Sequence, residues 1–570
     1  MTLDGAKVEV IRRYILSATE EVRRTLIRTA FSPGIYEVHD FGISIYDGNR
    51  ELIAEAPGLA QFLGANDTAI RKAVDYIGVA SLEPGDVVVM NYPYWNSAHV
   101  SDVTLYAGIF APDDAGRLIA YICIRAHWAD LGAKDVGYVL DSTDMHQEGL
   151  VFPGTKIYKR GRPDREIYEL IRFNSRLPDV VFGDMEAQVT AIRAGEKRIR
   201  EIYRKFGAEA YEAAIRKMFD YSESIARRAL QKLPQGTFEA SDYIDDDGIT
   251  GESIPIRVRI TIDSSGVVVD FDGSSPPVRG PVNLPLGTVK GLCKYFFKSL
   301  TTPALPADAG QFRALTVKVP ENSIFNAQYP AATYLLWSAH LVIELLYKAI
   351  ASKAPECVAA CSGGDILGFA TFGTRADGSY FGSGNNEAVG RGAARTHDGA
   401  SAVGHLAGAA VRNKPVELLE LNSNLFCEAL EFTSDSGGAG EFRGGLGLTR
   451  KLRFVSPGDF LTVTKRSKSP PWACAGGHAS QPNVAIYFPG SDKEKRVGTH
   501  RAAVQAGDRV IISSAGGAGY GNPHRRDPER VRQDVLDGYV TEQAARSVYG
   551  VAITHQALDH GATKVLRSEK

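Results

Sequence analysis

Residues 99–130 read HVSDVTLYAGIFAPDDAGRLIAYICIRAHWAD, and this stretch decides how the candidate site is built. Two strand-like runs, 103–110 and 118–125, flank a Pro-Asp-Asp-Ala-Gly turn, a pattern that predicts a β-hairpin. If Phe110 and Leu118 end the strands, facing residues have numbers that sum to 228 or 229. Asp102 and His127 are therefore expected to lie opposite each other.

A divalent-metal site needs imidazole and carboxylate groups that converge from rigid elements. His99, Asp102 and His127 supply three such groups at one end of the predicted hairpin. Asp40, at the start of an earlier strand-like segment, is the best candidate for a fourth ligand on local position. In the alternative interpretation, the two histidines are hydrogen-bonded loop-edge residues and Asp102 caps a turn.

Further candidates for chemistry follow the hairpin. Asp130 and His146 are reserve metal ligands, and the segment DSTDMHQEGL adds Asp144 and Glu148. Glu148 or Asp130 is the predicted general acid or base, although a solvated loop is the alternative interpretation of that segment. Mixed histidine and aspartate ligands favour zinc or manganese over calcium, and such an ion polarises a carbonyl or activates water. Hydrolysis or addition to a carbonyl is the predicted chemistry.

The flanking chain predicts an α+β fold with several domains. Helical periodicity covers 7–30 and most of 166–232, a hairpin is expected around Asp47-Gly48, and strand-like runs resume after Pro234. We predict a metal-site domain of sheet and helices, an α/β domain, a glycine-rich β-dominated domain and a C-terminal helical tail. These span 1–232, 233–354, 355–526 and 527–570.

Composition excludes several classes of protein. The 65 Lys and Arg balance 67 Asp and Glu, so no strong field for nucleic acid or an anionic membrane arises. The six cysteines form no Cys-x-x-Cys pair, and the first residues lack the features of a signal peptide. TYLLWSAHLVIELLYKAI is too short and too polar for a membrane span and predicts a buried helix. A soluble, cytoplasmic protein is expected.

Nucleotide-binding and nucleophile motifs are incomplete in this chain. Gly154-Thr155-Lys156 lacks the upstream glycine of a P-loop, and GGAGYGNP runs into Pro523 instead of opening a helix. The chain has no Gly-x-Ser-x-Gly segment. ATP binding by this chain alone is not expected.

The order of sequence blocks resembles the hydantoinase B family, which includes oxoprolinases and acetone carboxylase-type subunits. The resemblance runs nearly end to end. It rests on HDFGISIYD, GDVVVMNYPYWNSAHVSDV, RAHWADLG, MHQEGLVFPG, GDMEAQVTAIRAGEKR, DFDGSSPPVRGPVN, RNKPVELLE, DSGGAGEFRGGLGL and GGAGYGNPHRRDPERVRQDVLDGYV.

The resemblance implies a hetero-oligomeric enzyme. A hydantoinase A-type partner would bind ATP and phosphorylate the substrate oxygen, while this subunit would complete the reaction. By the same resemblance, the metal ligands are Asp40 in HDFG, His99 and Asp102 in HVSD, and His127 in RAHW. Three of these four agree with the hairpin argument.

Two positions depart from the family pattern. Asn96-Ser97-Ala98 stands where a Gly-Gly-Thr usually precedes the first metal histidine, which places side chains in a glycine turn. Asp308 stands where an asparagine is usual. The first departure bears on the substrate class more than on the metal.

Three functions compete at this point. The leading hypothesis is the metal-bearing subunit of an ATP-dependent cyclic-amide hydrolase that opens a hydantoin, lactam or oxoproline-like ring. The second is a subunit of an ATP-dependent ketone carboxylase of the acetone or acetophenone type, for which a third small subunit would be expected. The third is a scaffold without catalytic residues of its own.

Overall fold

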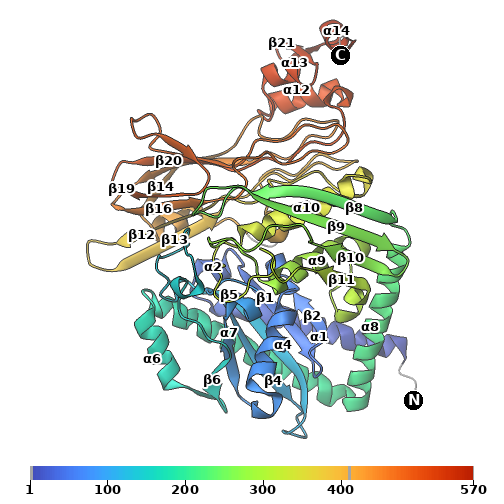
Figure 1. The fold of residues 1–570 in the computed structure, drawn as a ribbon, viewed down its shortest axis with the longest axis vertical. Coiled ribbons are helices and arrows are strands. Elements are labelled where there is room, and N and C mark those ends of the chain that lie inside the picture. The colour runs from blue at the N-terminus through green and yellow to red at the C-terminus, as the bar shows by residue number, and fades with distance from the viewer. Residues whose placement is uncertain (1–3, 409–411, 569–570) are drawn as a thin grey trace. The chain divides into compact units, whose positions relative to one another are not determined.

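The computed structural model describes residues 4–408 and 412–568. The chain forms two compact units, and each is discontinuous in sequence (Figure 1). The first comprises Met1–Thr237, Arg259–Ala339 and Ala407–Arg412, and the second comprises Phe238–Val258, His340–Leu406 and Asn413–Lys570. Both mix helices with antiparallel strands, which confirms the α+β class. The four-segment division along the chain stays a prediction.

The first unit is organised around a seven-stranded sheet of order β2-β1-β5-β4-β3-β6-β7. Each pair of neighbouring strands is antiparallel, and short turns join the pairs β1–β2, β4–β5 and β6–β7. The predicted turn at Asp47-Gly48 joins the first two strands. The strands are β1 (Phe41–Asp47), β2 (Leu52–Ala56), β3 (Val87–Met90), β4 (Asp102–Phe110), β5 (Leu118–His127), β6 (Thr155–Lys159) and β7 (Arg162–Pro163).

Both faces of this sheet are buried, because successive side chains point to opposite sides and helices cover each side. On one face, Ile43, Ile122 and Ile124 pack against α1 (Gly5–Thr29), α7 (Pro178–Phe206) and α8 (Ala208–Leu230). On the other, Tyr106 and Cys123 pack against α4 (Asn66–Ile77). The same part of the chain has shorter helical elements: α2 (Pro33–Tyr36), α3 (Ala60–Leu63), η1 (Val79–Ser81), α5 (Pro93–Asn96), η2 (Met145–Gln147) and α6 (Arg165–Asn174).

A second group of elements completes the first unit. β10 (Gly266–Asp270) pairs with the end of β9 (Ile254–Asp263) and, in parallel, with β11 (Leu315–Lys318). α9 (Leu286–Thr301) contacts α3, α4 and α8, and η3 (Ala309–Ala314) follows it. α9 thereby packs against several helices of the first unit.

The second unit contains two antiparallel sheets that share an apolar core. Their orders are β13-β12-β16-β19 and β14-β15-β20-β17-β18, and Phe369, Phe460, Leu452 and Ile512 from both sheets belong to one cluster. The first sheet comprises β12 (Gly368–Thr374), β13 (Tyr380–Asn386), β16 (Gly458–Val463) and β19 (His500–Val504). The second comprises β14 (Leu425–Phe432), β15 (Leu448–Phe454), β17 (Val484–Tyr487), β18 (Lys495–Val497) and β20 (Arg509–Ser513). The remaining helical elements and strand in this part of the chain are β8 (Gly236–Ile244), α10 (Trp337–Ala351), η4 (Pro355–Cys357), η5 (Leu406–Gly408) and α11 (Val416–Leu421).

Glycines let the backbone segments of the second unit approach closely, as the glycine-rich sequence predicts. A Cβ atom at Gly390 would lie 2.0 Å from the carbonyl oxygen of Gly445, and one at Gly517 would lie 1.8 Å from that of Arg391. Any side chain at either position would displace the main chain.

The C-terminal segment forms the two predicted helices and an unpredicted hairpin. η6 (Pro523–Arg525) is followed by α12 (Pro528–Leu536) and α13 (Glu542–Ser547), which flank Gly538 at a φ of 74°. β21 (Ala552–Thr554), β22 (Ala557–Asp559) and α14 (His560–Ser568) complete it.

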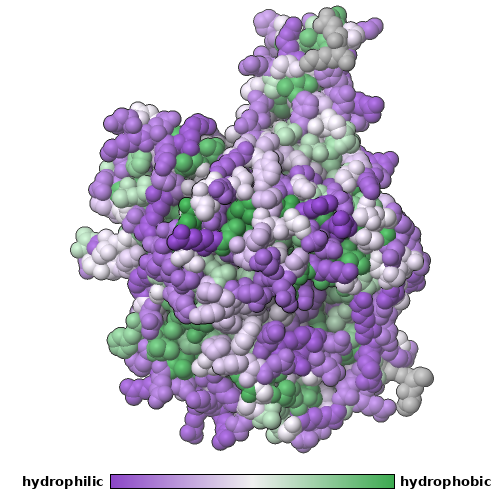
Figure 2. Space-filling view, in the orientation of Figure 1, coloured by the Kyte–Doolittle hydropathy of each residue, from purple (hydrophilic) through white to green (hydrophobic). Residues whose placement is uncertain are grey.

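The surface is largely polar. Figure 2 shows that hydrophilic side chains dominate the visible face, with smaller apolar areas between them. Within residues 4–408 and 412–568, no helix combines the length and apolar character that a membrane crossing requires. The most apolar predicted helix, α10, is buried as expected.

Candidate metal centre

The β4–β5 hairpin positions the candidate centre. Asp102 opens β4, His127 closes β5, and the two residues are register partners. The predicted register is confirmed at both ends, because Phe110 pairs with Leu118 and a one-residue irregularity next to Ile109 accounts for the change in the sum. His99 lies three residues before Asp102, in the turn that leads into β4.

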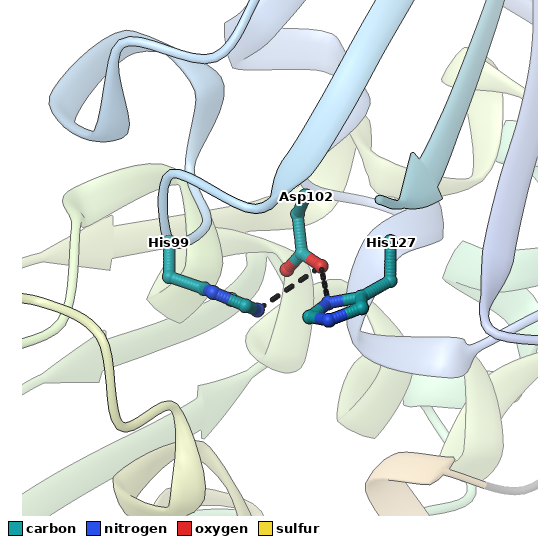
Figure 3. A group of neighbouring side chains, drawn as sticks. All are labelled: His99, Asp102 and His127. Carbon is teal, nitrogen blue, oxygen red and sulfur yellow. Dashed lines mark hydrogen bonds and ion pairs between the residues drawn. The ribbon is translucent and has the colours of Figure 1, made fainter. Parts of the chain in front are cut away.

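Three side chains converge at this point (Figure 3). His99 Nε2 and His127 Nδ1 each lie 3.1 Å from the same oxygen, Oδ1 of Asp102. One ligand atom from each residue lies within 4.8 Å of the others. In a tetrahedral site with ligand bonds of about 2.0 Å, neighbouring ligand atoms are about 3.3 Å apart. The arrangement therefore fits a divalent ion.

Polar atoms left without hydrogen bonds support this fit. Oδ2 of Asp102 and Nδ1 of His99 are buried and have no partner among the residues that the structure describes. Buried polar atoms are usually satisfied, and unsatisfied ones call for an explanation such as an ion. The three side chains thus leave buried polar atoms that an ion could satisfy.

The three groups tune one another electrostatically. Burial alone would raise the pKa of Asp102, but the adjacent His99 and His127 lower it below its usual value. Burial lowers the pKa of His99, which keeps its imidazole neutral. For His127, the hydrogen bond and charge of Asp102 outweigh burial and raise the pKa. The ionised Asp102 and the neutral His99 are thus in the protonation states that bind metal, whereas the raised pKa of His127 favours a protonated imidazole that has to lose its proton to bind one.

Asp40 lies next to this group without belonging to it. It directly precedes β1, and its main-chain oxygen accepts a hydrogen bond from the His127 amide at 3.3 Å. Its buried Oδ1 has no hydrogen-bond partner among the described residues. Burial raises the pKa of Asp40 to about 7, with opposing contributions from His127 and Asp102. The structure gathers three of the four predicted ligands, and the fourth stays a prediction.

The departure at Asn96-Ser97-Ala98 has a structural counterpart. Ser97 adopts a φ of 64°, a left-handed conformation that favours glycine, so the turn keeps the backbone that a glycine would supply. Asn96 uses its side chain to brace the site: Nδ2 donates to the main-chain oxygen of Asp102 at 2.5 Å, and Oδ1 accepts from Thr104 at 2.6 Å. The substituted turn thus holds the start of β4.

Asp308, the other departure, caps a short helix away from this turn. Its Oδ1 accepts hydrogen bonds from the Ser222 hydroxyl and from the Gln311 amide at 3.4 Å. The carboxylate therefore has a local structural role at the start of η3.

Tyr334 is a neighbour of the centre that sequence reasoning missed. Its ring lies 4.8 Å from that of His99, its hydroxyl donates to the carbonyl of Gly137 at 2.8 Å, and Ser101 Oγ lies 3.1 Å from it. It comes from a segment more than 200 residues further along the chain, so no local spacing could have revealed it. The Tyr334 ring therefore packs directly against the His99 imidazole.

Glu148, a predicted acid–base group, holds the Tyr334 segment. Its Oε1 accepts from the amides of Thr333 and Tyr334 at 2.8 and 3.0 Å and from the Ser142 hydroxyl at 2.8 Å. Burial raises its pKa to about 7, against the lowering effect of these hydrogen bonds. These contacts favour a positioning role for Glu148.

Asp130, the other predicted acid–base group, is engaged by Arg176. Its carboxylate pairs with the Arg176 guanidinium at 2.5 Å and accepts from the Arg176 and Gly132 amides at 2.5 and 3.1 Å. Both oxygens are therefore occupied. His146, the reserve ligand, is exposed and lies 3.1 Å from the Tyr329 hydroxyl.

Two residues of α7 support the centre from the helical layer. Gln188 accepts a hydrogen bond from the Trp128 indole at 2.7 Å. It donates to the main-chain oxygens of Val103 in β4 and Ile124 in β5, at 3.2 and 2.9 Å. The charge of Asp184 contributes to the raised pKa of His127. Both belong to the GDMEAQ block, whose polar residues at helical spacing were the available signal.

Comparison with known proteins now identifies the family. The family model described as hydantoinase B/oxoprolinase matches residues 4–523. The chain belongs to this family. A protein of Pseudomonas sp. (strain NS671), provisionally named as the B component of a D-/L-hydantoinase, is 29% identical over 593 residues, covering 99% of this chain and 98% of that protein. The β-subunit of the caprolactamase of Pseudomonas jessenii is 27% identical, and the match covers 100% of this chain and 99% of that one.

Solved structures confirm the fold. The crystal structure of ATP-dependent caprolactamase from Pseudomonas jessenii superposes with a TM-score of 0.90 and 26% identity over 100% of both chains. The nucleotide-free structure of an acetone carboxylase gives a TM-score of 0.89 at 17% identity, over 99% of this chain and 83% of that one. The second likeness shows a shared fold.

Proposed function

We propose that this chain is the metal-bearing subunit of an ATP-dependent hydrolase that opens cyclic amides. The observation that carries the proposal is the convergence of His99, Asp102 and His127 within 4.8 Å in a largely buried position. The names of the relatives support the substrate class, because one is a hydantoinase component and another a caprolactamase component. Hydantoin, lactam and oxoproline rings all contain a cyclic amide, which is the proposed substrate group.

A hydantoinase A-type subunit is the proposed partner. Two relatives are named as subunits, and the superposed caprolactamase is named as ATP-dependent. In the proposed division of work, the partner binds ATP and phosphorylates the amide oxygen. That step makes the amide carbon open to attack, and this subunit completes the ring opening in the hetero-oligomer.

Zinc or manganese is the proposed ion, since both accept mixed imidazole and carboxylate ligands. His99, Asp102 and His127 would hold it, with Asp40 as the proposed fourth ligand. When bound, such an ion polarises a carbonyl or phosphoryl oxygen and lowers the pKa of water. The donor set of one carboxylate and two imidazoles fits this chemistry.

The surrounding residues keep the ligands in place. Tyr334 packs against His99, Gln188 bridges the two ligand-bearing strands, and Asn96 fixes the start of β4. Glu148 is proposed to position Tyr334 rather than to transfer a proton directly, because its Oε1 already accepts three hydrogen bonds. Such outer contacts usually contribute to metal affinity.

The test is coupled turnover by the complex with its ATP-binding partner. Phosphate release and ring opening are measured on hydantoin, caprolactam and oxoproline, for wild type and for His99→Ala. Loss of both signals in the variant, together with loss of bound metal, is expected. His146→Ala is the matched control, because His146 is exposed and lies outside the centre. Ring opening that persists in the metal-free His99→Ala complex would sink the proposal.

The same assay separates the competing functions. Bicarbonate-dependent consumption of a ketone would assign the chain to carboxylation instead. Absence of metal from both wild type and His127→Ala, with turnover intact, would leave it as a scaffold for its partner.

A further inference from the structure

The first unit contains a pocket apart from the metal centre, at the opposite side of β1 from the hairpin that carries that centre. Its volume is about 750 Å³, and it is lined by α1, β2, the loop that follows β2, α9 and residues 303–307. None of its lining residues is a candidate metal ligand. Pockets of about 300–1,000 Å³ with mostly apolar walls and a few polar groups bind small molecules.

Glu55 of β2 is the polar group that distinguishes this pocket. It lines the pocket, and its main chain pairs with Ser44 of β1. The Glu55 side chain is partly exposed, and its Oε1 is buried and has no hydrogen-bond partner among the residues that the structure describes. Desolvation by burial, with the charge of Asp67, raises the pKa of Glu55 to about 8, although Lys294 and Lys298 oppose that shift. At neutral pH the carboxyl is mostly protonated, so it offers both a donor and an acceptor.

The pocket's lysines are already engaged. Lys294 forms an ion pair with Asp67 and lies 5.4 Å from the centre of the Phe312 ring. Lys298 donates to the main-chain oxygens of Thr302 and Pro303 at 2.7 and 3.3 Å, and to that of Leu305. These lysines are therefore held by the protein itself.

Glu20, at the α1 side of the pocket, is engaged in the same way. It accepts from Arg23 at 2.9 Å and from Arg24 at 3.0 Å. Of the pocket's charged side chains, Glu55 is thus the one with a buried polar atom that has no hydrogen-bond partner among the described residues.

Charge selects the class of ligand. A cationic ligand would approach two lysine ammonium groups in a partly desolvated pocket, and an anionic one would approach Glu20 and Asp67. Burying an unpaired charge costs far more than burying a hydrogen-bonded neutral group. The complement of a neutral carboxyl is a neutral group with a donor and an acceptor on one edge. A cis amide, as found in a lactam or hydantoin ring, has that edge.

We propose that this pocket is a second, non-catalytic binding site for a cyclic amide with an apolar substituent, whose N–H and C=O pair with the two oxygens of Glu55. The ring's substituent lies along the apolar wall formed by Leu16, Ala56 and Phe312. The choice of ligand rests on the proposed function, and the site would let the protein respond to its own class of substrate.

The binding experiment uses the full-length chain, calorimetry and a phenyl-substituted caprolactam as the probe. The probe binds wild type and His99→Ala equally, because the pocket does not involve the metal centre. Its N-methyl derivative, which lacks the donor, binds about tenfold more weakly, as does the parent lactam to Glu55→Leu. Equal binding of the two lactams, or loss of binding in His99→Ala, would overturn the proposal.

Glu55→Gln separates recognition from mere structure. Glutamine also carries a donor and an acceptor, so this variant keeps binding within about threefold of wild type. Wild type loses affinity above about pH 8, where Glu55 ionises and its donor disappears, whereas the glutamine variant does not. The charged groups around Glu55, namely Asp67, Lys294, Lys298 and Glu20, are the same in both proteins. A parallel fall in affinity in both proteins would contradict the proposal.

Ring opening by the complex with the partner is measured in parallel. If the proposed function fails, turnover is absent while the lactam still binds. If this inference fails, turnover is present while the Glu55 variants and the N-methyl lactam bind as wild type and parent do.

Discussion

Two carboxyl groups of one sheet, those of Asp102 and Glu55, have pKa values that are shifted in opposite directions. At Asp102 two imidazoles lie 3.1 Å from one oxygen, and the pKa falls below its usual value despite burial. At Glu55 the neighbouring lysines are engaged elsewhere, and burial raises the pKa to about 8. Both residues carry a carboxyl group and belong to the same sheet. The difference in pKa therefore comes from the partners within hydrogen-bonding distance.

The comparison teaches how each group is suited to a ligand. An ionised aspartate between two histidines offers lone pairs to a cation, whereas a neutral glutamic acid in an apolar pocket offers one donor and one acceptor. Strand register produces the first arrangement, since β4 and β5 place Asp102 opposite His127. The second requires helix α9 to approach β2 from a distant part of the sequence.

The largest expected effect comes from removing the carboxylate of Asp102, which the two histidines stabilise. Asp102→Ala deletes the oxygen that both imidazoles share, so we expect loss of bound metal and a fall in turnover on the order of 1,000-fold. Elemental analysis and the coupled ring-opening assay measure the two effects. Asp113→Ala is the control, because Asp113 lies in the exposed turn of the same hairpin. Stoichiometric metal in Asp102→Ala would refute the assignment of this ligand.

The second unit contains a buried carboxylate whose charge is balanced by an arginine, which allows a similar comparison. Glu387 pairs with Arg450 at 2.6 Å, and both side chains are almost fully buried. Glu387→Gln leaves the guanidinium buried without its counter-charge, and we expect a loss of about 3–5 kcal/mol in unfolding free energy. Calorimetric unfolding measures it.

The control for Glu387 is an exposed carboxylate on β14, the strand that pairs with the Arg450-bearing strand β15. Glu428 of β14 pairs with Arg509 at 3.0 Å, and the Arg509 side chain is half exposed. Glu428→Gln should cost less than about 1 kcal/mol, because solvent screens such pairs. Equal losses in the two variants would show that burial does not set the cost.

The sequence predicts the part of the site that lies within one hairpin. Alternation and turn residues place Asp102 opposite His127, because strand register follows from local geometry. The family resemblance to hydantoinase B, now confirmed, covers most of the chain. It also adds Asp40 to the predicted ligands, a position that the three-residue group does not include.

Long-range packing explains what the sequence does not reveal. Tyr334 reaches His99 from a segment with no periodic pattern, and Glu148 looks like a solvated acid in the sequence although it binds the amides of Thr333 and Tyr334. The pocket at Glu55 depends on α9 packing beside α3, which no short-range pattern specifies. Alternation in β2 predicts a polar position there, but the burial of Glu55 follows from elements more than 200 residues away.

Changing the support of a ligand should have a smaller effect than removing the ligand. Tyr334→Leu removes the ring that packs 4.8 Å from His99, so we expect metal affinity to fall about 10–100-fold. Tyr334→Phe keeps the ring and loses only the hydroxyl contacts with Ser101 and Gly137, and should lie between wild type and the leucine variant. Competition with a chelator measures the affinities. If the leucine variant binds metal as tightly as wild type, Tyr334 does not position His99.

The smallest expected effect is a change in the pH dependence of stability, which tests the carboxyl group of Glu55 without any ligand. Glu55 ordinarily titrates near 4.5 and does so at about 8 in the folded chain, so between these values the folded state binds more protons than the unfolded state. Its contribution to stability is complete below about pH 4.5 and is lost as the pH rises through 8. Glu55→Gln removes this dependence.

Relative to wild type, the variant should gain at least about 1 kcal/mol in unfolding free energy, or about one degree in unfolding temperature for a chain of this size, between pH 5 and pH 9. Glu20→Gln at the same pocket should show no such gain, because Arg23 and Arg24 already lower the pKa of Glu20. Parallel pH profiles for wild type and Glu55→Gln would mean that Glu55 is ionised at neutral pH and that the contrast with Asp102 does not hold.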